Sequence, residues 1–156
     1  MIAKKSQLLL RNFLLLKQTI EFIPTPTSEP INIQDITDLY PIDIDFFIQD
    51  SQKPLYQLFV KIEINLSDQK LPGYSIFAEG VGVFEFDKSI ENNDSEKGNF
   101  LYYSGISICI NSLRSIIANV TSHGPIGKYT FPSVDVNELL KDKGVLKQKP
   151  ATKTKA

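Results

Sequence analysis

The chain has 156 residues, of which 42% are hydrophobic and 22% are charged, a composition typical of one soluble domain with a sizeable core. The formal net charge is only −1. It conceals basic ends, because residues 141–156 hold six lysines against one aspartate and residues 1–23 hold four basic residues against one glutamate. The body between these ends is acidic, which excludes the usual basic footprint of a nucleic-acid-binding protein.

The first residues contain two lysines followed by Leu8–Leu10, as a secretion signal would. Arg11 interrupts the apolar run, and no small-residue cleavage site follows it. No stretch approaches the ~20 apolar residues that span a bilayer. Cys109 is the only cysteine, so an internal disulfide is excluded. We therefore expect a cytoplasmic protein without membrane insertion.

The first element in chain order is ambiguous. Residues 8–23 fit a helical stripe in their first part and an extended strand in their last part. We favour a strand over the last part, because residues 19–23 are rich in β-branched and aromatic side chains. The prolines at positions 24, 26 and 30 then predict a long irregular connection.

Three clearer strands follow, over residues 42–49, 57–66 and 74–86, where apolar and polar residues alternate. Gly80 and Gly82 lie inside the last of them and indicate a bulge or a close backbone neighbour. Residues 87–98 are polar and acidic, and we expect a mobile loop there.

A helix over residues 100–122 organises the rest of the chain, since apolar residues recur there every three or four positions. Gly124 and Pro125 end it. Asp135 is placed to cap a second short helix that ends near Leu140. The lysine-rich end is typical of disorder. We therefore expect one domain, residues 1–141, followed by a basic disordered tail, residues 142–156.

Short polar turns between consecutive strands favour antiparallel pairing. The predicted fold is α+β, a four-stranded antiparallel sheet with one face covered by the long helix, plus a short C-terminal helix. The other sheet face is expected to carry acids and phenylalanines and to be either solvated or a surface for protein contact. Its residues would be Asp43, Asp45, Phe47, Phe59, Glu63, Phe77, Glu79 and Glu85.

No catalytic constellation is evident. Cys109 and His123, the only residues of their types, are fourteen positions apart on the predicted helix, about 21 Å along its axis. They are therefore not a nucleophile–base pair. Cys109 is predicted to be a small buried hydrophobic residue, and His123 to be a structural residue at the helix end. We expect no enzymatic activity, no metal and no cofactor.

The order of parts and several segments resemble the bacterial SecB export-chaperone family. The matching segments are Leu113–Ile117, Ser122–Gly124, Phe131–Leu140, Phe77–Glu79 and Gly82–Phe84. With the strand order, the resemblance covers roughly residues 16–141. It implies a tetrameric, ATP-independent holdase that keeps unfolded preproteins soluble and delivers them to the SecA motor.

The resemblance also implies roles for particular residues. Clients would contact the loop after the first strand and the loop between the helices, at Tyr40, Ile126, Tyr129 and Phe131. Alternatively, Tyr129 and Phe131 only close the end of the core. The partner-docking surface would include Glu21, Phe77 and Glu79. The oligomer interface would lie on the long helix, at Ile106, Leu113 and Ile117.

Departures from the family pattern leave alternatives open. The first strand offers Gln18 and Glu21 in place of the family's acids, and both chain ends are basic. The chain could instead be a SecB-like chaperone dedicated to an antitoxin, as a homotetramer or dimer. A hot-dog thioesterase is a second alternative, although residues 100–123 contain no Asp or Glu. A third is a scaffold whose lysine tail contacts anionic surfaces.

Overall fold

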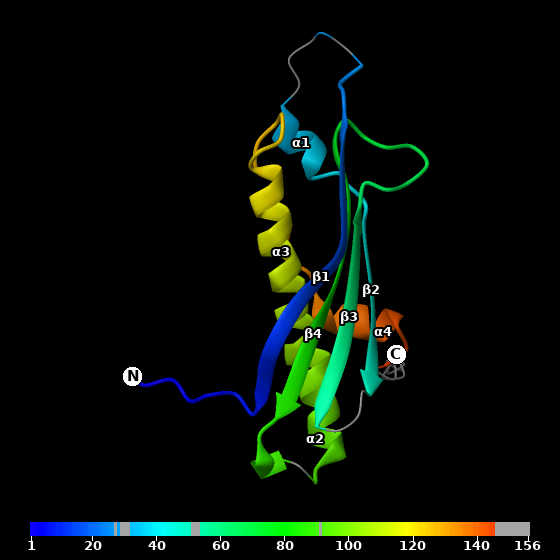
Figure 1. Ribbon diagram of the computed structural model, residues 1–156. Helices are drawn as coiled ribbons and strands as arrows, with labels where there is room; N and C mark the ends of the chain where they lie inside the picture. Colours follow the sequence, from blue (N-terminus) through cyan, green and yellow to red (C-terminus); the bar gives the residue numbers. More distant parts are fainter. Residues whose placement is uncertain (27, 29–31, 51–53, 91, 146–156) are drawn as a thin grey trace, which may run out of the picture.

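The structure, a computed structural model, describes residues 1–26, 28, 32–50, 54–90 and 92–145. Four strands form one antiparallel sheet in the order β1-β4-β3-β2. They are β1 (Leu8–Ile23), β2 (Ile42–Asp50), β3 (Leu55–Ile64) and β4 (Gly73–Phe86). A long helical segment lies along one face of the sheet (Figure 1). The predicted α+β fold is confirmed.

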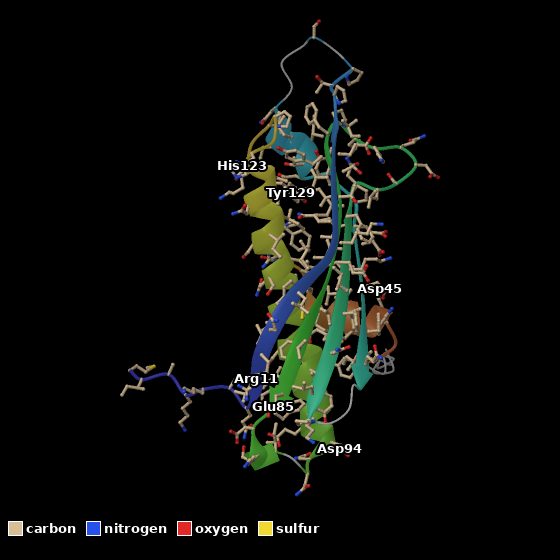
Figure 2. The ribbon with its side chains drawn as sticks, in the orientation of Figure 1. Arg11, Asp45, Glu85, Asp94, His123 and Tyr129 are labelled. Atoms are coloured by element: carbon tan, nitrogen blue, oxygen red, sulfur yellow. The ribbon has the colours of Figure 1, made fainter. Side chains whose placement is uncertain are left out.

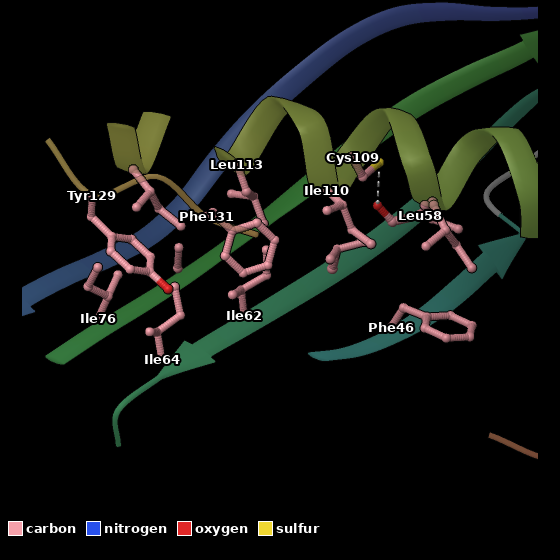
Figure 3. Packing of buried hydrophobic residues seen from close by; sticks show 14 of the residues in the cluster. Phe46, Leu58, Ile62, Ile64, Ile76, Cys109, Ile110, Leu113, Tyr129 and Phe131 are labelled. Atoms are coloured by element: carbon pink, nitrogen blue, oxygen red, sulfur yellow. Dashed lines mark hydrogen bonds between the residues drawn. The ribbon is translucent and has the colours of Figure 1, made fainter. Parts of the chain in front are cut away.

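The core lies between this helical segment and the sheet, as Figure 3 shows. Side chains of a strand point alternately to its two faces, so one set of alternate residues is buried. In β3 this set is Leu58, Val60, Ile62 and Ile64, all fully buried. Ile106, Leu113 and Ile117 meet them from the helix and are also fully buried. Burial of each such side chain stabilises the fold by roughly 1.5–3 kcal/mol.

The long helical segment starts earlier than its apolar periodicity predicts. It consists of α2 (Asp94–Asn99), a π-helical turn η2 (Phe100–Gly105) and α3 (Ile106–Thr121). Asn93 caps it: its side-chain oxygen accepts a hydrogen bond from the Glu96 N–H at 3.1 Å, and its amide donates to the Glu96 carboxylate at 3.0 Å. The expectation of a loop over 87–98 is therefore wrong, because η1 (Lys88–Ile90) and α2 occupy most of it.

Strand β1 is also longer than predicted and occupies the whole ambiguous stretch. Its register against β4 shifts between Leu10 and Asn12 and again between Leu15 and Lys17. Each shift adds a residue and breaks the two-residue alternation, which explains why the pattern resembled a helix. The interpretation of the β4 glycines is confirmed at Gly80, which lies opposite the second register shift and whose Cβ would lie 3.1 Å from the Leu14 carbonyl, but at Gly82 the close neighbours are side chains. A Cβ on Gly80 would lie 2.5 Å from the Phe13 ring, and one on Gly82 would lie 2.6 Å from the Cys109 sulfur.

Two short helices complete the described chain. The connection after β1 contains α1 (Ile33–Thr37), which begins at the capping residue Asn32. The closing helix α4 (Val136–Asp142) starts where predicted, because the Asp135 carboxylate accepts hydrogen bonds from the N–H groups of two following residues. Helix α4 ends one residue beyond the expected domain boundary. Residues 146–156 of the expected tail lie outside the described residues.

Candidate functional site

A cleft between α1, the end of β1 and the loop after α3 is the best candidate for a binding site; we call it the loop cleft. It is a small recess with a cavity volume of about 20 Å³. Its lining is almost entirely apolar and consists of Phe22, Ile23, Thr25, Ile33, Ile36, Pro72, Gly73 and Ile126. A second hollow, towards Lys128 and Thr130, shares Ile33 and Ile126 with it. Apolar walls without fixed polar groups suit side chains of varied sequence.

Tyr40 fixes one wall of the loop cleft. Its hydroxyl donates a hydrogen bond to the Pro72 carbonyl at 2.7 Å and accepts one from the Tyr74 N–H at 2.9 Å. These bonds attach the segment that contains α1 to the start of β4. Burial, the largest influence, raises the pKa of Tyr40, so the phenol stays protonated and able to donate at neutral pH.

Tyr74 fixes the opposite wall, formed by the loop after α3. Its hydroxyl oxygen lies 2.8 Å from the Gly127 carbonyl and 3.1 Å from the Thr121 carbonyl. Gly124 leaves room for this contact, since a Cβ there would lie 2.2 Å from the hydroxyl. Both walls of the loop cleft are thus hydrogen-bonded to Tyr74, at the start of strand β4.

The four predicted client-binding residues occupy different environments. Ile126 is half-buried and lines the loop cleft. Tyr40, Tyr129 and Phe131 are 6%, 4% and 2% exposed and belong to the core. Tyr129 and Phe131 therefore lie where the alternative interpretation placed them, closing this end of the core (Figure 3). The client-binding role of these residues stays a prediction.

Burial raises the pKa of Tyr129 to about 12. Among the described residues its hydroxyl has no hydrogen-bond partner. Figure 2 shows Tyr129 and His123 at the α1 end of the molecule, away from Arg11, Glu85 and Asp94. His123 is exposed just beyond the end of α3.

The expected oligomer-interface residues must be corrected. Ile106, Leu113 and Ile117 are each 0% exposed within the single chain, because they pack against the sheet. They have no free surface to offer a second copy. Exposed apolar surface lies elsewhere, on the edge strand β1, where Leu14, Leu15 and Leu16 are 45%, 43% and 50% exposed.

The sheet face turned away from α3, here called the outer face, carries the predicted docking residues. In the register of β1 against β4, Lys17 lies opposite Glu79, Thr19 opposite Phe77 and Glu21 opposite Ser75. The ammonium of Lys17 lies 5.1 Å from the centre of the Phe77 ring. Glu21 forms a 2.6 Å ion pair with Lys70. The structure thus brings Glu21, Phe77 and Glu79 together on two adjacent strands; their docking role stays a prediction.

Cys109 is fully buried, with its sulfur 3.9 Å from the Leu58 carbonyl, as Figure 3 shows. Burial raises the pKa of its thiol to about 12, so the thiolate is scarce at neutral pH. The prediction that Cys109 is a small buried hydrophobic residue is confirmed. Within the described ranges, no group of three or more His, Cys, Asp and Glu side chains could hold a metal ion. In the same ranges, no helix is long and apolar enough to cross a membrane.

Sequence reasoning missed some residues of the loop cleft. Phe22 was expected only as a strand residue, yet its ring is 40% exposed and lies 6.4 Å, edge to face, from the Tyr74 ring. The missed signal is the position of Phe22 two residues before Pro24, since a proline ends a strand and leaves its last side chains at the end of the sheet.

Comparison with known proteins gives a likeness of fold. No described protein family matches the sequence, and no curated protein sequence matches it. Among solved structures, the chain is similar to the Mycobacterium tuberculosis Rv1957 SecB-like chaperone in complex with a ChAD peptide from the Rv1956 HigA1 antitoxin. The TM-score is 0.59 at 12% sequence identity, over 83% of this chain and 91% of that one. The two chains share the SecB-like α+β fold.

Proposed function

We propose that this protein is an ATP-independent chaperone that holds unfolded polypeptides in the loop cleft. The observation that carries the proposal is the apolar lining of that cleft, formed by Phe22, Ile33, Ile36 and Ile126. Two of these residues lie on a short helix and one on a loop, and apolar walls without fixed polar groups accept side chains of varied sequence. The shared fold with a SecB-like chaperone supports the same conclusion.

The test is suppression of aggregation without nucleotide. A chemically denatured client is diluted into buffer with a stoichiometric amount of the pure protein, and light scattering is followed. The proposal predicts a reduced and delayed rise in scattering. Scattering identical to that with an equal mass of an inert folded protein would refute it.

A narrower candidate is a chaperone dedicated to one antitoxin, with the cytoplasm as its place of action. The supporting observation is that the structural neighbour is a SecB-like chaperone in complex with an antitoxin peptide. Titration of antitoxin-derived peptides and of an unrelated unfolded peptide tests it. A dedicated chaperone would bind one antitoxin peptide at least tenfold more tightly, whereas an export holdase would bind all of them similarly.

Partner docking and self-assembly form the last part of the proposal. We assign docking of a translocation motor or another partner to Glu21, Phe77 and Glu79 on the outer face. We assign homo-oligomerisation, as a dimer or tetramer, to β1, because an edge strand with exposed leucines has unpaired backbone groups that a second copy can bond. Light scattering measures the mass, and Leu15→Lys with Leu16→Lys should shift it towards the monomer.

A further inference from the structure

We propose that the lysine-rich segment 146–156 binds the outer face of its own chain, across β2 and β3. The segment contains four lysines, at positions 147, 149, 153 and 155. It lies outside the described residues, and its attachment point, Val145, is the last residue that the structure describes. This inference does not depend on the proposed chaperone function.

The first argument is charge. Among the described side chains of β2, β3 and β4, every charged one lies at an outer-face position. The set has five carboxylates and one ammonium: Asp43, Asp45, Glu63, Glu79, Glu85 and Lys61. Three of the carboxylates already have an ion-pair partner, Glu85 with Arg11, Glu63 with Lys61 and Asp45 with Lys143, and Lys17 of β1 lies opposite Glu79. Asp43 and Glu63 lie directly opposite each other, a like-charge pairing that is unfavourable until a cation joins it. Lys61 contacts Glu63 at 3.2 Å, while no described cation lies within ion-pair distance of Asp43.

The second argument is the route of the chain. Lys143, two residues before the last described one, already reaches round the edge strand β2. Its ammonium forms an ion pair with Asp45 and lies 5.7 Å from the centre of the Phe46 ring. The ion pair lowers the pKa of Asp45, chiefly through the hydrogen bond from Lys143. The last described residue, Val145, packs against the core, so the chain leaves the described part at the β2 edge of the sheet, where the Lys143 ammonium already reaches Asp45 of the outer face.

The third argument is length and spacing. Eleven extended residues reach about 36 Å, whereas the outer strands of a four-stranded sheet are only about 14 Å apart. All four lysines occupy odd positions, so an extended segment would present them on one side. Successive side chains on one side of an extended chain are about 6.7 Å apart. Asp43 and Asp45, two residues apart on β2, have this same spacing.

The fourth argument is the exposed aromatic surface beside the carboxylates. Phe47 and Phe59 stack with their ring centres 4.5 Å apart and their planes 4° from parallel, and Phe47 is 55% exposed. A hollow next to them is lined by Asp45, Phe46, Phe47, Phe59, Lys61 and Glu79. Lysine stems pack on such rings while the ammonium reaches a carboxylate. Lys17 already lies over Phe77 of the outer face in this way.

The experiment is paramagnetic broadening in the full chain. A nitroxide is attached at Ala151→Cys; Cys109 is buried and will not compete for the label. At low salt, amides of residues 43–47 and 59–63 should lose at least half of their intensity, whereas amides of residues 111–115 on α3 should keep theirs. The loss should shrink in 0.5 M salt, where the Debye length falls to about 4 Å.

Three variants of the labelled chain complete the test. Asp43→Lys should abolish the broadening, and it should fold because the introduced ammonium would face Glu63 with opposite charge. Asp35→Lys, on exposed α1, makes the same change in net charge and should leave the broadening intact. Replacing the four tail lysines with glutamine should remove it.

Broadening that is uniform along the chain, centred on α3, or equal in Asp43→Lys and Asp35→Lys would overturn the proposal. A further experiment distinguishes binding to the same chain from binding to a second copy. It uses a mixture of isotope-labelled chain without nitroxide and unlabelled chain with nitroxide. Broadening in this mixture would mean that the segment binds a second copy, which also contradicts the proposal. If the segment binds its own chain, a partner that docks at Phe77 and Glu79 would compete with it.

Discussion

The hydroxyl of Tyr40 accepts a hydrogen bond from the backbone N–H of Tyr74 at 2.9 Å, across 34 positions of sequence. The same hydroxyl donates to the Pro72 carbonyl, so one oxygen connects the segment after β1 to the start of β4. This connection holds α1 beside the loop after α3 and thereby forms the loop cleft.

Replacement of Tyr40 by Phe should therefore destabilise the fold. The buried Tyr74 N–H would lose its partner, which costs about 1–3 kcal/mol in the free energy of unfolding. Urea unfolding measures this loss. Tyr103→Phe is the matched control, because Tyr103 is 38% exposed and its hydroxyl can be solvated by water. Equal unfolding midpoints for the two variants would contradict the role assigned to Tyr40.

The opposite result is expected at Tyr129. Its buried hydroxyl has no partner among the described residues, and an unpaired buried hydroxyl costs free energy. Tyr129→Phe removes only this group and keeps the ring that closes the core. We expect the free energy of unfolding to rise by about 1 kcal/mol. A loss of stability in calorimetry would show that the hydroxyl is bonded in solution.

Stability should fall steeply in alkali. Burial raises the pKa of Cys109 from its ordinary 9.0, and that of Tyr129 from 10.0, to about 12 each. At a pH between a group's ordinary pKa and its raised pKa, the side chain has lost its proton in the unfolded chain but keeps it in the folded chain. This difference favours unfolding by up to about 1.4 kcal/mol per group and pH unit. Below pH 9 neither group contributes, since both states are protonated.

Unfolding at pH 8, 10 and 11 tests this linkage. Many lysines also titrate in this range, so wild type must be compared with Tyr129→Phe and Cys109→Ala. Each variant should lose less stability than wild type between pH 10 and 11. Parallel loss in all three proteins would show that the two buried groups do not cause the alkaline transition.

The early start of the long helical segment depends on Asn93. Asn93→Ala removes the cap from the Glu96 N–H and should lower the free energy of unfolding by about 1 kcal/mol. Asn93→Asp should keep most of the wild-type free energy of unfolding, because aspartate caps a helix as well as asparagine does. Hydrogen exchange of residues 96–99 provides a local measure, and unchanged protection in Asn93→Ala would argue against capping.

The sequence was sufficient to predict the fold class, because period-two alternation in β2, β3 and β4 and a long apolar helical face determine it. The start of the helical segment was predictable in principle from Asn93 and Glu96, which form a capping pair. The extent of β1 was not, since its two register shifts disrupt the alternation that identifies a strand.

The site was only partly predictable. Ile126, which was predicted to contact clients, lies on a wall of the loop cleft, because a loop between helices lies at the surface, and its client-binding role stays a prediction. Tyr129 and Phe131 were expected on the same loop, but this segment folds back into the core. The N–H of Tyr129 donates to the Thr121 hydroxyl at 2.9 Å, and Arg114 donates to the Phe131 carbonyl at 3.2 Å. Such contacts between distant residues have no signature in local sequence.

The most direct test of the loop cleft is the affinity for an unfolded client, measured by fluorescence anisotropy with the double variant Ile36→Ser and Ile126→Ser. Each isoleucine should contribute about 1 kcal/mol of apolar contact, so the variant should bind at least tenfold more weakly than wild type. Val120→Ser, at an exposed apolar position on α3, should bind like wild type. Equal affinity of the double variant and wild type, at equal oligomeric mass, would contradict the account.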